Sequence, residues 1–272
     1  MTEFPKSIKT IRARLQNFGT IDAGRKEKII ANIILSQMLP ASAVRGGTGL
    51  KIRFGDYQTR GSKDLDVALT QDIDEFILEF GDNLSLGWNG FTGQLIKSKK
   101  ISRPKDIPRT YVTVTWDVKL FFNGYEWVRQ EIDLGHEEIG DVDEIDLEMS
   151  DEILLWFDAV GVPRPEAIPV IKIHHQIAQK LHALISNPSE RIHDLVDLQV
   201  IFSRQEIVRE KTNETCKRLF NSRNTITWPS KLAFNLDDES LYINAIEQTG
   251  SISDLESAVN WINEKINWLN QN

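Results

Sequence analysis

Two aspartates separated by one apolar residue are the first feature of this sequence that could do chemistry. Asp64 and Asp66 flank Leu65, and Val67-Ala68-Leu69 continues a short run typical of a strand. Side chains i and i+2 of a strand share a face, so the two carboxylates are expected side by side. Two such charges repel each other unless a cation lies between them. Carboxylate oxygens suit Mg²⁺, which usually completes its shell with water and substrate phosphates.

A glycine pair precedes these aspartates. Gly46 and Gly47 open a segment that is rich in glycine and basic residues and that leads to Asp64. Because glycine lacks Cβ, backbone N–H groups at such a turn can approach a phosphate chain closely. The pair therefore indicates a phosphate-binding turn, and a purely structural tight turn is the alternative.

This frame resembles the AbiEii/AbiGii toxin family of nucleotidyltransferases. That family includes the MenT-type toxins and belongs to the DNA polymerase β-like superfamily. Its first motif is a Gly-Gly or Gly-Ser pair, a spacer, an arginine and Asp-x-Asp, matched here at Gly46, Gly47, Arg60, Asp64 and Asp66. Sixteen residues separate Gly47 from Asp64, which is longer than the general superfamily spacer.

The resemblance implies an enzyme that uses an NTP and two Mg²⁺ ions. Asp64 and Asp66 would hold the metal ions together with a third carboxylate. The nucleotide-binding residues that it implies are Gly46, Gly47, Thr48, Arg60, Ser62 and Lys180.

The third carboxylate is expected on a neighbouring strand. Asp133 is our choice, because it lies on a predicted strand after the hairpin signal Asn123-Gly124. Glu131 projects to the same face and is a rival, and Asp117 is a weaker one. The family often has a lysine two positions before this carboxylate, where this chain has Glu131.

A second resemblance covers the predicted helices after Pro169. Residues Gln176–Leu184 match the family's Gln-x-x-Ala-x-Lys-Leu-x-Ala segment, and Arg191–Leu198 match its Arg-x-x-Asp-Leu-x-Asp-Leu segment. The lysine and the first aspartate are functional in the family, which implies that role for Lys180 and Asp194. Lys180 would offer a compact positive charge to the triphosphate. A helix–helix salt bridge without a chemical role is the alternative.

The predicted elements divide the chain into an α+β part and a helical part. We expect a nucleotidyltransferase-type mixed β-sheet with flanking helices over residues 1–171, followed by an all-helical domain over 172–272. The alternation in Ala43–Phe54 and in 65–69, 111–116 and 120–134 predicts strands, and 140–151 reads as an acidic connector. Later helices are expected to open at Asn187-Pro188 and at Ser253.

Charge and composition suggest the partners and the compartment. Residues 1–63 carry 12 Lys and Arg against 4 Asp and Glu, whereas 131–166 carry 1 against 13. The single Cys216 fits a reducing compartment. No apolar run approaches the ~20 residues of a membrane helix, so a cytoplasmic protein without a membrane partner is expected. The lysines and arginines that could hold an RNA backbone are Lys97, Lys99, Lys100, Arg103, Lys105 and Arg109.

The family resemblance implies a toxin whose acceptor is RNA, with the 3′ end of tRNA as the leading candidate, and a cognate antitoxin protein as partner. Two alternatives remain at this point. The acceptor could be a protein or a small molecule, or the chain could be a nucleotide-binding regulatory module without catalysis.

Overall fold

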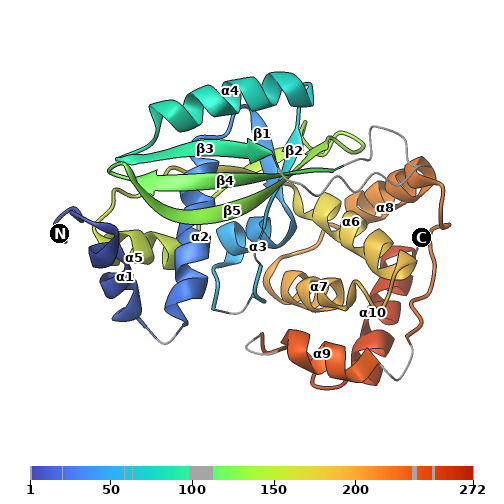
Figure 1. The fold of residues 1–272 in the computed structure, drawn as a ribbon. Coiled ribbons are helices and arrows are strands. Elements are labelled where there is room, and N and C mark those ends of the chain that lie inside the picture. Colours follow the sequence, from blue (N-terminus) through green and yellow to red (C-terminus); the bar gives the residue numbers. More distant parts are fainter. Residues whose placement is uncertain are drawn as a thin grey trace. The chain divides into compact units, whose positions relative to one another are not determined.

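The computed structural model describes residues 2–19, 21–57, 59–62, 64–97, 113–234, 238–246 and 249–271. These residues form two compact units (Figure 1). The first comprises Met1–Asp56 and Gly61–Ile171, and the second comprises Tyr57–Arg60 and Lys172–Asn272.

A mixed sheet of seven strands organises the first unit, as far as the described residues show it. The strand order is β3-β4-β5-β2-β1-β7-β6. β1 runs parallel to β7 and β2 parallel to β5, while the other neighbours are antiparallel. The mixed sheet that the sequence predicts is therefore confirmed. Its strands are β1 Ser42–Arg45, β2 Leu65–Leu69, β3 Phe91–Lys97, β4 Val114–Phe122, β5 Tyr125–His136, β6 Ile145–Glu148 and β7 Ile168–Ile171.

Helices cover this sheet, and all of them except α3 begin at a capping side chain. Ser7, Asp22, Asp72 and Ser150 each accept a hydrogen bond from a backbone N–H in the first turn that follows. Figure 1 shows α4 running along β3, with α1, α2 and α5 on the side of β5. The helices are α1 Ile8–Gln16, α2 Ala23–Ser36, α3 Gly46–Phe54, α4 Ile73–Leu86 and α5 Asp151–Val160.

The two faces of the central strands differ in character. Leu65 and Val67 of β2 and Ile132 and Leu134 of β5 are fully buried in the main hydrophobic core. The alternate positions point to the opposite face, where β2 and β5 carry acidic side chains. Core burial on one face therefore fixes the register that presents the carboxylates on the other.

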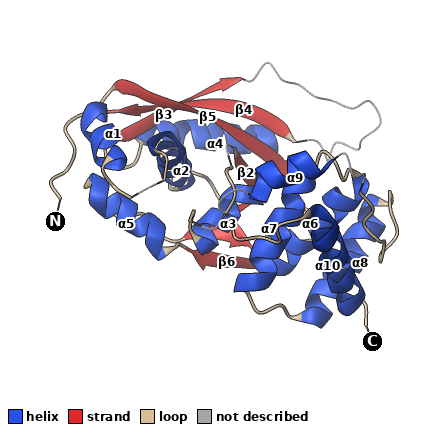
Figure 2. Cartoon of the chain, turned by 90° about the horizontal axis from the view of Figure 1, so that it is seen from below, coloured by secondary structure: helices blue, strands red, loops and turns tan. Residues whose placement is uncertain are grey.

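The regular elements of the second unit are all helices as far as its residues are described, as predicted. Figure 2 shows the helices of the molecule in blue, including α6 to α10. Cys216 is buried among them, and burial raises the pKa of its thiol, which fits a packing role. The helices are α6 Ile173–Ser186, α7 Ile192–Arg204, α8 Arg209–Arg223, α9 Glu239–Ile246 and α10 Leu255–Leu269.

The strand expected from the alternation of Leu50, Ile52 and Phe54 is wrong. β1 ends at Arg45, and α3 begins at Gly46. The alternation of Leu50 and Ile52 was misleading because α3 is buried almost all round, Lys51 included. A helix that is buried on every side carries no amphipathic period.

Of four predicted turns and element boundaries, one is confirmed and three are wrong. The hairpin at Asn123-Gly124 is confirmed, and both turn residues have positive φ. The expected connector 140–151 instead contains β6 and the start of α5. Asn187 ends α6 and does not open α7, and Asp254, not Ser253, caps α10. Turn chemistry located these boundaries only to within a few residues.

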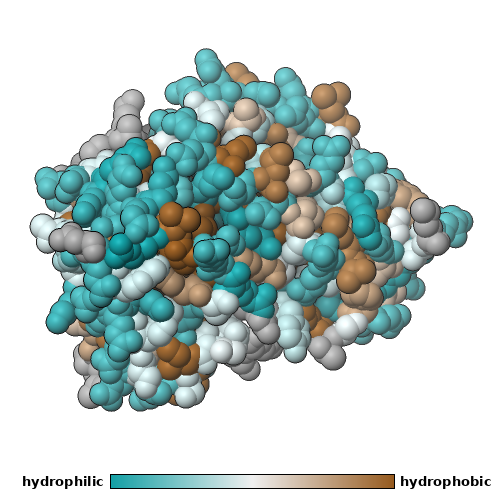
Figure 3. All heavy atoms as spheres, turned by 180° about the vertical axis from the view of Figure 1, so that it is seen from behind, coloured by the Kyte–Doolittle hydropathy of each residue, from teal (hydrophilic) through white to brown (hydrophobic). Residues whose placement is uncertain are grey.

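Hydrophilic side chains dominate the face drawn in Figure 3, with apolar ones between them. Among the exposed large apolar residues, Leu78 and Leu86 belong to α4 and Leu147 belongs to β6. None of the described helices combines the length and the apolar character that a bilayer-spanning helix needs.

A buried ion cluster holds the C-terminal end of α3. The Asp56 carboxylate is fully buried and pairs with Lys51 and with Arg25, whose Nε lies 2.7 Å from Oδ2. The backbone N–H of Asp56 donates to Glu152 at 2.9 Å. This cluster anchors the helix whose other end lies beside the acidic face.

We predict that Asp56→Asn lowers the free energy of unfolding by about 3–5 kcal/mol, because it leaves the Lys51 ammonium buried without its anion. Urea unfolding followed by circular dichroism measures this. Asp158→Asn is the matched control, since Asp158 pairs with Arg164 at the surface and its loss should barely move the urea midpoint. Equal effects of the two substitutions would contradict the buried-cluster argument.

Candidate active site on the acidic face of the sheet

Asp66 and Asp133 are neighbours across the parallel pair β2–β5. They occupy directly matched register positions and so point to the same face. Neighbouring strands lie about 4.8 Å apart, which brings the two carboxylates close together. Thr115 of β4 donates from Oγ1 to Asp133 Oδ1 at 2.6 Å and fixes one side of that carboxylate. The structure thus brings together two residues that lie far apart in sequence.

Asp64 lies in a bend one residue before β2, so strand alternation alone does not place its side chain. Its backbone is held instead by hydrogen bonds. Thr48 Oγ1 donates to the Asp64 carbonyl at 2.8 Å, and Asn32 Nδ2 donates to Thr48 Oγ1 at 3.3 Å. Gln130 Nε2 donates to Asn32 Oδ1 at 2.6 Å. This chain of side chains ties α2, α3 and β5 to the start of β2.

The same chain of hydrogen bonds shows what Thr48 does in this structure. Its side chain is buried, with 2% exposure, and its hydroxyl donates to the carbonyl oxygen of Asp64. The nucleotide contact of Thr48 stays a prediction, and in this structure its hydroxyl positions the backbone of Asp64.

Gly46 is required by the close approach of Asp66. A Cβ built on Gly46 would lie 2.0 Å from Asp66 Oδ2, and Gly46 also has a φ of +64°. No side chain caps the helix that begins here, so the first N–H groups of α3 have no such partner. The uncapped N-terminus of a helix attracts anions. Gly46 and Gly47 thus place a site suited to phosphate beside the carboxylate of Asp66.

Arg45 lies on the same face, and the sequence patterns predict no role for it. It pairs in register with Asp66, and its Nη2 lies only 2.3 Å from where a Cβ on Gly135 would stand. Gly135 follows Asp133 on the same face of β5, so the guanidinium crosses the sheet from β1 to β5. Within the described part of the chain, the Arg45 side chain has no ion pair or hydrogen bond. A glycine inside a strand was the sequence signal for such a close approach.

The rival carboxylates occupy less favourable positions. Glu131 lies on the same face as Asp133, two residues earlier along β5. It precedes Ile132, which is the register partner of Leu65. Asp117 of β4 pairs with Arg129 at 2.7 Å. The register therefore favours Asp133 as the neighbour of Asp66.

No group of three His, Cys, Asp or Glu side chains stands ready to hold a metal ion among the residues that the structure describes. The donor chemistry of the acidic face still fits Mg²⁺. Two carboxylates in register, with an uncapped helix start beside them, offer hard oxygen ligands next to a phosphate site.

A buried ion cluster occupies the second unit. Lys180 Nζ lies 2.7 Å from Asp194 Oδ1 and 2.6 Å from Asp197 Oδ2. Arg60 Nη2 lies 2.9 Å from Asp197 Oδ2. The structure thus confirms that Lys180 meets Asp194, and it adds Arg60 and Asp197 to the pair. Arg191 stays half-exposed, with Nη1 3.8 Å from Asp194.

The charges of this cluster stabilise one another. Burial opposes ionisation of Asp197, but attraction to Lys180 and Arg60 outweighs it and holds the pKa of this carboxyl below its ordinary value. Burial likewise opposes the charge on Lys180, but Asp194 and Asp197 hold the pKa of Lys180 above its ordinary value. The ammonium therefore stays protonated throughout the physiological pH range.

Gln176 lies one helical turn before Lys180 on α6. Its side chain is 1% exposed, and both amide atoms lack a hydrogen-bond partner within the described residues. Each such buried group costs about 1–3 kcal/mol when it is unsatisfied. A ligand that hydrogen-bonds this amide would recover that free energy.

The structure says little about two further predictions, the nucleotide contact of Ser62 and the RNA-binding basic residues. Ser62 is half-buried just before the acidic motif. The side chains of Lys97, Lys99, Lys100, Arg103, Lys105 and Arg109 lie outside the described residues.

The ion cluster predicts a pH-dependent effect of Asp197→Asn on stability. The depressed pKa of Asp197 gives stability that is complete above its unfolded pKa, about 3.9, and is lost as pH falls through the lower folded pKa. The difference in unfolding free energy between wild type and variant should therefore be largest near neutral pH and shrink below about pH 4. Urea unfolding at several pH values measures it, and a pH-independent difference would contradict the cluster's electrostatic role.

Comparison with known proteins identifies the family. A family model described as "Nucleotidyl transferase AbiEii toxin, Type IV TA system" matches residues 28–261. The fold matches MenT4, a nucleotidyltransferase toxin from Mycobacterium tuberculosis H37Rv, at a TM-score of 0.59 and 14% identity, over 98% of this chain and 91% of that one. A proposed nucleotidyltransferase from H. pylori aligns at 14% identity and a TM-score of 0.45, over 91% of this chain and 97% of its own.

No curated protein sequence matches the chain. The family model nevertheless covers most of it, and the fold agrees with that of a toxin of the same kind. The protein therefore belongs to the AbiEii nucleotidyl transferase toxin family of type IV toxin–antitoxin systems.

Proposed function

We propose that this nucleotidyltransferase uses Asp64, Asp66 and Asp133 to hold two Mg²⁺ ions and transfers the NMP of an NTP to a hydroxyl of an RNA acceptor. The observation that carries the proposal is the register match of Asp66 with Asp133 beside the glycine start of α3. It combines two hard-oxygen ligands with a phosphate-binding helix terminus on one face.

The chemistry is an in-line displacement at the α-phosphorus. The acceptor oxygen forms a bond to phosphorus, the bond from phosphorus to the bridging oxygen breaks, and pyrophosphate leaves. Bound Mg²⁺ would neutralise phosphate charge and help to deprotonate the attacking hydroxyl. Asp133, oriented by Thr115, is our candidate for the carboxylate nearest that hydroxyl, and Glu131 is the alternative.

The nucleotide would be held by groups on the same face. The N–H groups of Gly46 and Gly47 suit its phosphates, and the Arg45 guanidinium offers a planar fork of donors that stays charged. We retain Arg60, Ser62, Lys180 and Asp194 as functional residues because they match or adjoin the family motifs.

The acceptor, antitoxin and location are the finer parts of the proposal. The 3′ end of tRNA is our leading acceptor, with a protein or small molecule as the second candidate. A toxin of this family implies a cognate antitoxin. Because tRNA and NTPs are cytoplasmic, we expect the protein to act there. Family membership argues against a purely regulatory, non-catalytic module.

We predict that the wild-type protein transfers label from at least one α-labelled NTP to tRNA in the presence of Mg²⁺. Asp64→Asn and Asp133→Asn should each lower that rate by roughly 10²-fold or more, because each removes a metal ligand. Gel analysis of labelled products measures this, with thermal unfolding as the folding check.

Three controls sharpen this test. Asp158→Asn removes an exposed carboxylate and should leave the rate unchanged. Glu131→Gln separates the two candidates for the third ligand, since a large loss there with an active Asp133→Asn would reassign the role. Label found only on protein or small molecules would reassign the acceptor, and no labelled product of any kind would refute the mechanism.

A separate prediction concerns Arg45 as a phosphate ligand. Arg45→Lys should raise the KM for the NTP by about ten- to hundredfold, because charged hydrogen bonds contribute about 1.5–3 kcal/mol. Gly135→Ala should do the same, because its Cβ would displace the guanidinium. Steady-state kinetics at saturating tRNA measure both.

Gly81→Ala is the matched control for the glycine substitution, because a Cβ there would lie 4.0 Å from its nearest neighbour, Leu95 Cδ1. It should leave the KM unchanged. Unchanged KM values in both Arg45→Lys and Gly135→Ala would show that the guanidinium does not contact the nucleotide.

A further inference from the structure

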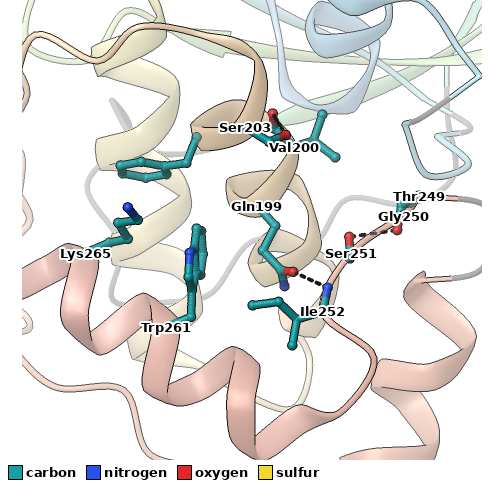
Figure 4. Close-up of a pocket in the computed structure, with 10 residues that line it drawn as sticks. Gln199, Val200, Ser203, Thr249, Gly250, Ser251, Ile252, Trp261 and Lys265 are labelled. Atoms are coloured by element: carbon teal, nitrogen blue, oxygen red, sulfur yellow. Dashed lines mark hydrogen bonds between the residues drawn. The ribbon is translucent and has the colours of Figure 1, made fainter.

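A pocket in the second unit has a lining unlike the acidic face. It has a volume of about 220 Å³ and lies between the end of α7, the segment 249–252 and α10 (Figure 4). Its lining combines aromatic rings, one lysine and small polar residues, and none of its lining residues is acidic. Ligand pockets usually measure about 300–1,000 Å³, so this one would admit a single planar ring and not a whole oligomer.

Lys265 supplies the only formal charge among the described residues of that lining. Its Nζ lies 5.6 Å from the centre of the Phe202 ring and 5.9 Å from those of Trp261 and Trp268. Among the described residues, Lys265 has no carboxylate partner. The ammonium is thus held over ring faces and remains available to an anion.

The segment opposite α10 adds two backbone donors. Gly250 has a φ of +66°, and a Cβ there would meet nothing within 4 Å. Within the described structure, the N–H groups of Gly250 and Ser251 donate to no protein acceptor. Successive unpartnered N–H groups at such a turn form a concave site for an anion.

The pocket is pre-formed by buried hydrogen bonds. Gln199 Oε1 accepts from the N–H of Ile252 at 2.8 Å, as Figure 4 shows, and its Nε2 donates to Tyr242 at 2.9 Å. Tyr242 is fully buried and donates to the Ile252 carbonyl at 2.7 Å. These bonds hold the segment against α7, so binding would not have to order it.

We propose that this pocket binds one nucleotide of a single-stranded RNA. The base would stack on the Trp261 ring with its edge toward Phe202, whose ring is perpendicular to that of Trp261, and its phosphate would lie between Lys265 and the N–H groups of Gly250 and Ser251. Stacking on aromatic rings together with a nearby cation is how proteins hold single strands without reading their sequence. An acidic peptide would satisfy Lys265 but leave the rings unused.

The assignment of this strand to the acceptor rests on the proposed function, whereas RNA binding at the pocket does not. The test is therefore performed without NTP and without Mg²⁺, so that no transfer occurs. Fluorescence anisotropy with a labelled eight-nucleotide single-stranded RNA gives the Kd at several salt concentrations, and thermal unfolding verifies each variant's fold.

Lys265→Gln should weaken binding about tenfold and lower the salt slope by about 0.7, the value for one phosphate contact on a single strand. Trp261→Leu should weaken binding about tenfold or more, and Trp261→Phe should recover most of it because a ring face remains. Lys231→Gln, which removes an exposed lysine outside the pocket, should change the Kd less than twofold.

Three outcomes would overturn the proposal. The first is an unchanged Kd in both Lys265→Gln and Trp261→Leu. The second is adenosine or uridine monophosphate binding as tightly as the RNA, which would make the ligand a free nucleotide. The third is an acidic peptide that binds while the RNA does not. Loss of RNA binding in a variant that still transfers label to a small molecule would leave the proposed chemistry intact.

Discussion

Repulsion between carboxylates that share one face of the sheet is the constraint on which this structure depends. Asp66 and Asp133 are register neighbours in parallel strands, and the helix start at Gly46 lies against the first of them. The protein supplies positive charge there through an uncapped helix terminus and through the Arg45 guanidinium, which has no ion pair among the residues that the structure describes. A divalent cation with a triphosphate would complete the charge balance.

The remainder of the first unit holds this arrangement in place by burial and hydrogen bonding. Alternate positions of β2 and β5 are sealed in the core, which prevents the strands from slipping. The chain from Gln130 through Asn32 and Thr48 fixes the backbone of Asp64, which strand geometry alone would not do. The Asp56 cluster anchors the far end of α3.

In the second unit, buried charges are balanced by side chains of opposite charge. Lys180 and Arg60 face Asp194 and Asp197, so buried charges of both signs cancel locally. Such a network is specific and costly to break, although it adds little net stability compared with an apolar core. By contrast, Lys265 lies over aromatic rings and has no carboxylate partner in the described part of the chain, which is why we assign an anionic, planar ligand to its pocket.

The sequence alone determined the local features of this protein: the Asp-x-Asp motif, the family, the hairpin at Asn123-Gly124 and the helical second half. These features follow from the spacing of motif residues, the residue types at turns and the period of apolar residues, all of which are set by residues close together in sequence. Tertiary structure decided what depends on burial from every side and on strand register. The apolar pattern did not predict helix α3, because nearly all of its faces are buried. The pairing of Asp66 with Asp133, and the Arg45 side chain against Gly135, required the strand order, which no local pattern specifies.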